Sequence, residues 1–233
     1  MGGQDRVGAK TEPRPSATVV VLRDAKDAPP RLEFLLLQRS ARDGKPGAWV
    51  FPGGKVEAGD VVAGEPGSRE SALRAAVRET HEEAGLDLAA TRLVAISRWI
   101  TPEISPQRFD TWFFLGVVDT TREVVVCGSE IIAHRWITPA EALAAHERSE
   151  IQLAPPTFVT VQWLSAHSHA AHAQEVLGRE PILTFRPRIH RGAAGTYMLY
   201  PGDAGYDAGD PDLPGPRHRI QALASGWRYE RSD

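Results

Sequence analysis

The sequence predicts an α/β fold in which a mixed sheet lies between layers of helices, an α/β/α sandwich with a C-terminal extension. Short runs of β-branched and aromatic residues alternate with longer segments of helical periodicity, and turns rich in glycine and proline separate them. This alternation is typical of strands and helices packed in layers. The 233 residues, 42% of them hydrophobic, suffice for one sizeable core, or for one domain plus an extension.

The first two strand-like segments are joined by the turn-rich residues 24–30, which indicates an antiparallel pair. A third short strand leads into a glycine-rich turn, and a helix follows the turn. The elements expected in this part are strands at 16–23, 32–38 and 48–51 and a helix at about 68–84.

Further strands are expected before a helix that begins after Thr138. Proline at its first position and Glu141 at capping-box spacing indicate this start. The elements expected here are strands at 93–99, 110–118 and 131–137, and a later helix at about 156–167.

The two ends of the chain differ from this central part. Residues 1–14 are rich in glycine, proline and charge and predict a flexible tail. Residues 15–167 are expected to form the main domain, and residues 168–233 an extension that packs on it. Within the extension, strands are expected at 181–189, 196–200, 218–223 and 227–230, with a loop at 201–216.

Charge and cysteine content limit the partners and the compartment. A net charge of −3 gives no electrostatic footprint for nucleic acid or for a membrane surface. The single cysteine, Cys127, excludes an intramolecular disulfide and suits a reducing compartment. Because the sequence shows no signal peptide and no apolar run of about 18 residues, we expect a cytoplasmic protein.

The helix expected at 68–84 carries three carboxylates on one face, because Glu79, Glu82 and Glu83 stand at i, i+3 and i+4. Like charges this close raise one another's pKa and cost roughly 0.2–0.5 kcal/mol per pair. Mg²⁺, which binds carboxylates together with substrate phosphates, would reverse that penalty. The alternative is a solvated acidic face, which is common on surface helices.

Two neighbouring features favour a ligand site over a solvated face. The helix is preceded by Phe51-Pro52-Gly53-Gly54-Lys55, a glycine turn that allows backbone to approach a ligand closely. Gly85 directly follows the acidic turn and suits a helix C-cap.

Small side chains lie on the same side of this helix as the glutamates. Alanines there would leave room for a bulky ligand, so we expect Ala75 and Ala76, together with Ala72, to border the ligand site. The opposite side is expected to face the core, and its residues are Leu73, Val77, Thr80 and Ala84.

These segments resemble a known motif. The turn Gly53-Gly54-Lys55-Val56-Glu57, followed by Arg78-Glu79-x-x-Glu82-Glu83-x-Gly85-Leu86, is similar to the Nudix box of the Nudix hydrolases. The family pattern is Gly-x5-Glu-x7-Arg-Glu-U-x-Glu-Glu-x-Gly-U, where U is bulky and apolar, and Thr80 at a U position departs mildly from it. The resemblance implies the Nudix fold, an α/β/α sandwich.

Two registers of the motif fit the chain. Counted without a gap, the motif begins at Gly64 and places its outer carboxylate at Glu70. Counted from the glycine turn, it begins at Gly54, reaches Asp60 and needs a ten-residue insertion, with the segment from Val61 to Arg69 as an inserted loop. The second register is favoured because the glycine turn follows strand-like residues, and the outer carboxylate is then either Asp60 or Glu70.

A broader, incomplete resemblance over residues 16–165 concerns the substrate. Leu35 to Ser40 with Gly47 to Gly54 resembles part of the signature of coenzyme A diphosphatases, although Leu37 replaces a threonine and Arg42 is displaced. Further segments resemble the branch that includes the peroxisomal coenzyme A diphosphatase, which also carries an insertion in its box. These segments are Thr101-Pro102, Arg108-Phe109-Asp110-Thr111, Phe113-Phe114, 139–143 and 153–157.

The resemblance implies hydrolysis of a nucleoside diphosphate linked to another group, with Mg²⁺ or Mn²⁺ as cofactor. It implies that Glu79 and Glu83 bind the metal, that the Gly54 carbonyl completes the shell, and that Glu82 binds a second ion or bridges, with a catalytic role. Arg78 matches a residue that orients the glutamates by ion pairing.

The general base and the substrate contacts are less directly marked. Glu130, just before the strand at 131–137, is the leading candidate for the base, and Glu103 is a second candidate. Arg39, Lys55 and Arg108 are candidates to bind phosphates, and the 3′-phosphate of coenzyme A is one candidate partner of Arg108. Three aromatic residues are candidates to stack on a purine, namely Trp49, Phe109 and Trp112. Aromatic residues beside strands more often belong to the hydrophobic core.

Two classes of function follow from these patterns. The first is a small-molecule diphosphatase acting on coenzyme A or acyl-coenzyme A, with ADP-ribose or a dinucleotide as the next substrates to consider. The second is a non-catalytic Nudix-fold sensor. Three mutually repelling carboxylates favour the enzyme, since a binding module has no need of them. Because Nudix relatives often form dimers, a homodimer is one candidate assembly.

Overall fold

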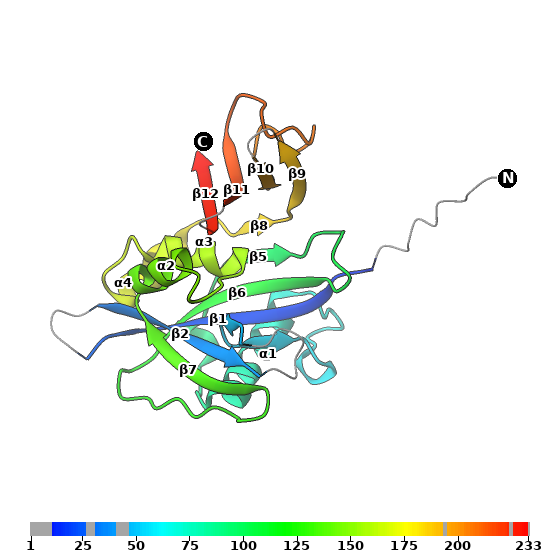
Figure 1. Ribbon diagram of the computed structural model, residues 1–233. Coiled ribbons are helices and arrows are strands. Elements are labelled where there is room, and N and C mark those ends of the chain that lie inside the picture. The colour runs from blue at the N-terminus through cyan, green and yellow to red at the C-terminus, as the bar shows by residue number, and fades with distance from the viewer. Residues whose placement is uncertain (1–10, 27–30, 41–46, 193–194, 224–225, 233) are drawn as a thin grey trace.

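The computed structural model describes residues 11–26, 31–40, 47–192, 195–223 and 226–232 (Figure 1). Its main sheet contains eight strands in the order β3-β2-β1-β6-β5-β8, with β4 paired to β1 and β7 paired to β2. β1 runs antiparallel to β2 and parallel to β6, so the sheet is mixed as expected. The strands are β1 (Arg14–Asp24), β2 (Leu32–Arg39), β3 (Trp49–Val50), β4 (Gly53–Lys55), β5 (Val94–Ile100), β6 (Phe109–Val117), β7 (Ile131–Ile137) and β8 (Leu183–Phe185).

Helices cover both faces of this sheet and confirm the α/β/α sandwich. On one face, α1 (Arg69–Ala84) packs on Val19 and Val21 of β1; on the other, Val20 and Leu22 belong to the core that α2, α3 and α4 share. The alternation follows from the two-residue period of a strand. The bounds of the other helices are α2 (Pro139–Glu147), α3 (Pro155–Leu164) and α4 (Ala170–Arg179), with short 3₁₀ turns η2 (Ala58–Asp60) and η3 (Ala90–Arg92).

Local capping fixes both ends of α1. The hydroxyl of Ser68 accepts a hydrogen bond of 3.1 Å from the backbone amide of Ser71. At the other end Gly85 has φ of 65°, a left-handed conformation that glycine adopts at low cost. α2 begins with the expected capping box between Thr138 and Glu141. The expected starts of both helices are therefore confirmed.

The glycine turn differs from expectation because part of it is a strand. Gly53–Lys55 forms β4, which pairs with residues 16–18 of β1. A Cβ atom at Gly53, where φ is 154°, would overlap the backbone of Ala17 and Thr18. Glycine is required here because β4 lies too close to β1 for a side chain.

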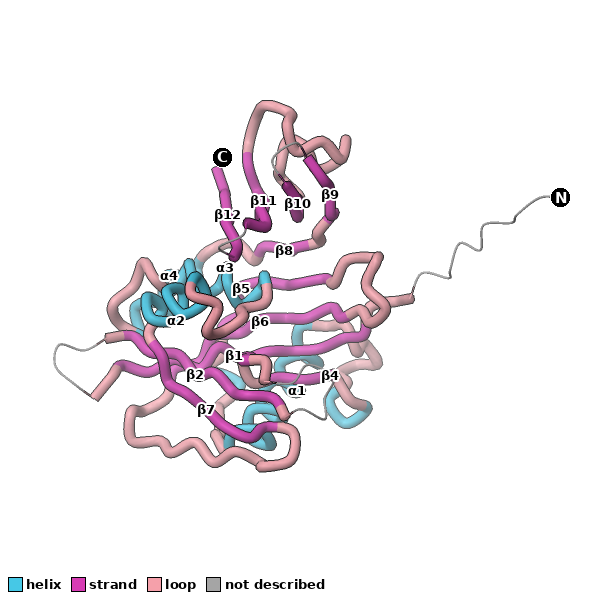
Figure 2. The backbone as a smooth tube through the Cα atoms, viewed as in Figure 1, coloured by secondary structure: helices cyan, strands magenta, loops and turns pink. Residues whose placement is uncertain are grey.

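The C-terminal segment forms a second, four-stranded antiparallel sheet in the order β12-β11-β10-β9. Figures 1 and 2 show it standing over the β8 edge of the main sheet. The strand expected at 181–189 is two strands, since β8 joins the main sheet and β9 the small one, and α4 was not expected. The strands are β9 (Arg188–Gly192), β10 (Gly195–Leu199), β11 (Arg217–Leu223) and β12 (Gly226–Ser232).

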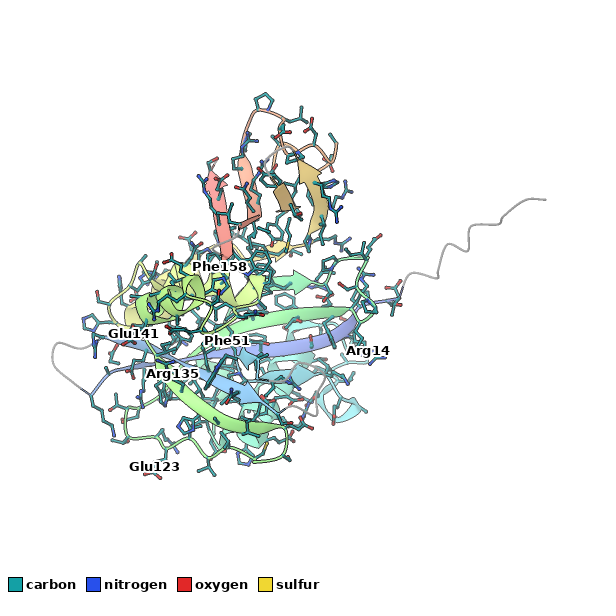
Figure 3. All side chains as sticks on the ribbon, viewed as in Figure 1. Arg14, Phe51, Glu123, Arg135, Glu141 and Phe158 are labelled. Carbon is teal, nitrogen blue, oxygen red and sulfur yellow. The ribbon has the colours of Figure 1, made fainter. Side chains whose placement is uncertain are left out.

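Aromatic rings join the two sheets. Phe185 of β8 stacks on Trp99 of β5 with ring centroids 3.8 Å apart, and it meets Tyr200 edge to face at 4.9 Å. Figure 3 marks Phe51 and Phe158, two further members of the same core. α4 and β8, which follow residue 167, pack into the main sandwich. The boundary expected between main domain and extension at residue 167 stays a prediction. No helix in the described part of the chain is long and apolar enough to span a bilayer.

Candidate active site

A cavity of about 400 Å³ opens where β1, β4 and the C-terminal half of α1 meet. Its lining combines acidic and basic side chains with glycine backbone. The structure thus brings together most of the residues expected at the site, namely Arg39, Gly54, Lys55, Glu79, Glu82, Glu83 and Glu130. Glu57, at the end of the glycine turn, also lines the cavity and was not singled out from the sequence, although it lies inside the motif.

Glu83 is the most buried carboxylate of the cavity. Its side chain lies under β4, and its Oε2 accepts a hydrogen bond of 2.9 Å from the backbone amide of Gly53. Burial raises the pKa of Glu83 to about 7, with repulsion from Glu79 and Glu130 adding to the effect, against the Gly53 hydrogen bond and the charge of Arg39. A cation bound here would therefore stabilise the charged form of Glu83.

Glu79 lies directly against Gly54. A Cβ atom at Gly54 would overlap the Glu79 carboxylate, so glycine is needed for this contact. Burial raises the pKa of Glu79, while the neighbouring Arg78 guanidinium opposes that rise. The backbone at Gly53 and Gly54 consequently contacts both the buried Glu83 and the half-buried Glu79.

Arg78 connects the glutamates to the glycine segment. Its Nη1 donates to Oε1 of Glu79 at 3.1 Å and to Oε2 of Glu82 at 2.9 Å. Its Nη2 donates to the carbonyl of Lys55 at 3.0 Å and to Oδ2 of Asp60 at 2.9 Å. The hydrogen bond to Asp60 most of all, together with the contacts to Glu79, raises the pKa of Arg78, while burial acts to lower it. An orienting role for Arg78, as the resemblance implied, fits this geometry.

The same contacts distinguish the two registers of the motif. Asp60 is buried and paired with Arg78, and this pairing lowers its pKa although burial acts to raise it. The Glu70 side chain is 58% exposed and forms an ion pair with its neighbour Arg69. A Cβ atom added at Gly64 would have no neighbour within 4 Å among the described residues, whereas one added at Gly54 would meet the Glu79 carboxylate. The geometry therefore favours the register that begins at Gly54 and uses Asp60, with the following loop inserted.

The expectation for the alanines of α1 is wrong. Ala72, Ala75 and Ala76 are fully buried against the sheet, in the core shared with Val19 and Val21. Small side chains let α1 approach the sheet closely, which places Glu79 and Glu83 at its edge. Two residues expected in the core, Leu73 and Val77, are only half-buried on its flank. Thr80 and Ala84 are buried as expected.

A β-bulge shapes the opposite rim of the cavity. The pairing of β2 with β7 shifts between Gln38 and Arg39, and the Ser40 amide then donates a 2.7 Å hydrogen bond to the carbonyl of Glu130. Bulges of this kind turn side chains out of the regular ladder. Arg39 and Glu130 consequently line the same cavity as the glutamates of α1.

Two of the expected residues do not reach the cavity. The Arg108 guanidinium donates to the carbonyls of Thr101 at 3.2 Å and Thr11 at 2.8 Å, and neither Arg108 nor Glu103 lines the cavity. Phe109 does line it, whereas Trp49 and Trp112 pack against the two cores. The core interpretation was therefore correct for these two tryptophans.

The donor set fits a divalent cation by its chemistry. Glu79, Glu82 and Glu83 supply oxygen ligands, which hard cations such as Mg²⁺ prefer, and burial of two of them disfavours their charge unless a cation is near. In the described residues, no three acidic, histidine or cysteine side chains are already arranged as a complete set of metal ligands. Arg78 instead bridges Glu79 and Glu82.

The layered fold and the acidic cavity under a glycine segment define the Nudix class. A family model for the NUDIX domain matches residues 12–164, and the chain belongs to this family. A solved structure, that of a NUDIX hydrolase from Alicyclobacillus acidocaldarius, is 27% identical and superposes with a TM-score of 0.64 over 74% of this chain and 100% of that one.

Among curated proteins, the chain is similar to acyl-coenzyme A diphosphatases NUDT19. It is 32% identical to the Xenopus laevis protein over 58% of this chain and 39% of that protein. To the human protein it is 33% identical over 47% of this chain and 31% of that protein. The aligned part thus spans less than half the length of these two relatives. The Gallus gallus protein is 27% identical over 79% of this chain and 75% of that protein.

Proposed function

We propose that the protein is a Mg²⁺- or Mn²⁺-dependent hydrolase of the pyrophosphate bond in a nucleoside diphosphate linked to another group, with coenzyme A or acyl-coenzyme A as the first substrate to test. One observation carries the proposal: the buried Glu83 and the half-buried Glu79 share a cavity with the cationic Arg39 and Lys55. Such a cavity suits a metal ion next to a dianionic diphosphate.

Glu79, Glu83 and the Gly54 carbonyl would hold the metal in this proposal, and Glu82 a second ion. When bound, the metal neutralises charge on the phosphate oxygens and lowers the pKa of water. Arg39 would bind a phosphate bidentately and Lys55 as a point charge. Arg108 is left out of the set, because its guanidinium hydrogen bonds to two backbone carbonyls.

Glu130 is the proposed general base, since it lines the cavity across from α1. Its carboxylate would accept a proton from water as the water oxygen bonds to one phosphorus. The bridging P–O bond breaks, and its oxygen leaves with the electron pair as part of the second phosphate. The products are two phosphomonoesters, which for coenzyme A are 3′,5′-ADP and 4′-phosphopantetheine.

The preference for coenzyme A substrates rests on the curated relatives, whose names describe them as acyl-coenzyme A diphosphatases. ADP-ribose and dinucleotides are the next candidates within the same chemistry. A non-catalytic nucleotide sensor is the candidate of a different class. The three carboxylates of α1 disfavour it, since a binding module has no need of them. The cytoplasmic location and the homodimer stay predictions from the sequence.

Product analysis by mass spectrometry tests the proposal. The purified chain is incubated with coenzyme A, an acyl-coenzyme A, ADP-ribose and NADH, with Mg²⁺, with Mn²⁺ and with EDTA, beside a Glu83→Gln control. Metal-dependent cleavage of coenzyme A that is lost in the control supports the whole proposal. Preference for ADP-ribose or NADH would keep the chemistry and reject the substrate, and no cleavage of any substrate would favour the sensor.

A further inference from the structure

A second cavity, of about 390 Å³, adjoins the acidic one. Three residues line both cavities, Thr18, Phe109 and Thr111, so the two cavities are direct neighbours. Every described side chain that lines the second cavity is uncharged, and most are aromatic, aliphatic or proline. A ligand that leaves the acidic cavity in this direction therefore meets an apolar environment.

The C-terminal sheet supplies the outer wall of this second cavity. Ile189 of β9 and Met198 of β10 are directly paired across the two strands and both line it, as does Tyr200. The inner wall is Phe51, Trp99 and Phe113 of the main domain. The cavity is thus a property of the whole chain, because its two walls come from segments at least 76 residues apart in sequence.

Hydrogen bonds within the C-terminal sheet and its loop order the outer wall. Arg219 of β11 forms a buried bidentate pair with Asp203, at 2.7 Å and 2.6 Å, and Asp203 also accepts from the amides of Gly205 and His218. These bonds fix the loop at 201–216 against the small sheet. Together with the Trp99–Phe185 stack, they make the second cavity preformed.

The polar groups in this cavity suit an aliphatic group better than a nucleobase. Its main side-chain donors and acceptors are hydroxyls and the indole N–H of Trp99. Three of these groups are already engaged: Thr101 accepts from the amide of Phe109, Thr111 bonds to Ser16, and Trp99 donates to Ser97. A purine or pyrimidine brings several polar edge atoms, which are costly to bury without partners. An aliphatic group brings none or few.

We propose that the cavity between the main and C-terminal sheets binds a largely aliphatic group attached to the far phosphate of the substrate, and that β9 and β10 make the protein selective for that group. This inference rests on the proposed function, because it takes the diphosphate to lie in the acidic cavity. The C-terminal extension is then a specificity element of the enzyme.

Two esters of ADP, with a methyl or a hexyl group on the β-phosphate, test the proposal in the full-length protein with Mg²⁺. Hydrolysis releases AMP from both, so only the aliphatic group differs. Each methylene buried from water is worth about 4-fold in binding, and we expect kcat/KM for the hexyl ester to exceed that for the methyl ester by at least about tenfold.

The wall variant is Ile189→Asp, and the matched control is Leu223→Asp on the same small sheet. Ile189 is 37% exposed and Leu223 41%, so the two changes place a charge at similarly accessible sites, but only Ile189 lines the cavity. We expect the hexyl-to-methyl ratio to fall to near one in Ile189→Asp, to fall partly in Ile189→Ala, and to persist in Leu223→Asp.

A wild-type ratio near one, or a ratio that persists in Ile189→Asp, overturns the proposal. So does a loss of discrimination between ADP and UDP esters in Ile189→Asp with the alkyl ratio intact, because the cavity would then hold the base. Calorimetric binding of both esters repeats the test without turnover. If the hexyl ester binds more tightly through Ile189 but neither ester is cleaved, the inference stands and the hydrolase proposal fails.

Discussion

The backbone amide of Gly53 donates a hydrogen bond of 2.9 Å to the carboxylate of Glu83, a group that is only 5% exposed. One hydrogen bond of this kind does not compensate for the burial of the charge, and the pKa of Glu83 is raised from 4.5 to about 7. The fold therefore places an acidic group where it weakens the metal-free protein and where a cation would relieve the cost.

This relationship predicts how stability depends on pH. Between pH 4.5 and about 7 the folded protein keeps a proton on Glu83 that the unfolded chain has lost. Without metal, the contribution of Glu83 to the free energy of unfolding is therefore fully present below pH 4.5. It is lost as the pH rises through about 7, and the loss amounts to about 3 kcal/mol. Glu83→Gln should remove this contribution, so it should be more stable than the wild type at pH 8.

Urea unfolding at pH 5 and pH 8 in EDTA measures the effect. Glu82→Gln is the matched control, because the Glu82 side chain is 54% exposed. Equal pH dependence of stability in the wild type and in Glu83→Gln would show that Glu83 is not the group responsible.

The two registers of the motif make opposite predictions for Asp60 and Glu70. Asp60→Ala removes the partner of the Arg78 Nε and Nη2 groups and should cost about 2 kcal/mol of stability. It should also lower kcat/KM at least about tenfold, because Arg78 positions Glu79 and Glu82. Glu70→Ala, at an exposed site, should change neither.

Thermal unfolding and steady-state kinetics on both variants separate the registers. If Glu70→Ala loses activity while Asp60→Ala keeps wild-type activity and stability, the motif register that begins at Gly64 is the correct one.

Local signals in the sequence predicted much of the fold. The C-cap at Gly85 and the capping box at Thr138 act over a few residues, so they can be recognised without the tertiary structure. The spacing of Glu79, Glu82 and Glu83 placed the three carboxylates together for the same reason. Their meeting with the Gly53–Gly54 backbone could be expected only from the family motif.

Features that depend on long-range packing were not predictable. The rotation of α1 was misjudged because alanines on the glutamate side suggested space, whereas they allow close contact with the sheet. The helix α4 is only ten residues long, and neither a side-chain cap nor an acidic first turn marks its start. The break at Arg186-Pro187, which separates β8 from β9, depends on which sheet each strand joins. The second cavity likewise combines segments far apart in sequence.

Because Ala76 is buried, Ala76→Leu should destabilise the protein rather than act on the substrate. Overpacking a close helix–sheet contact typically costs about 1–3 kcal/mol, which corresponds to a fall in Tm of about 2–4 °C per kcal/mol for a chain of this size. Ala171→Leu on the exposed side of α4 is the control and should leave Tm nearly unchanged. An unchanged Tm with a raised KM in Ala76→Leu would instead return Ala76 to the ligand site.

Glu130 is the residue whose catalytic role most needs a direct test. It lines the cavity opposite Glu83, close enough to add to the repulsion that raises the pKa of Glu83. If Glu130 accepts the proton from water, Glu130→Gln should lower kcat by about 10²–10⁴ and should leave the metal-induced rise in Tm intact, because the proposed metal ligands remain. Glu103→Gln, outside the cavity, should keep wild-type kcat. Turnover like that of the wild type in Glu130→Gln would remove Glu130 from the mechanism, whereas loss of the metal-induced Tm rise in that variant would assign it to the metal site.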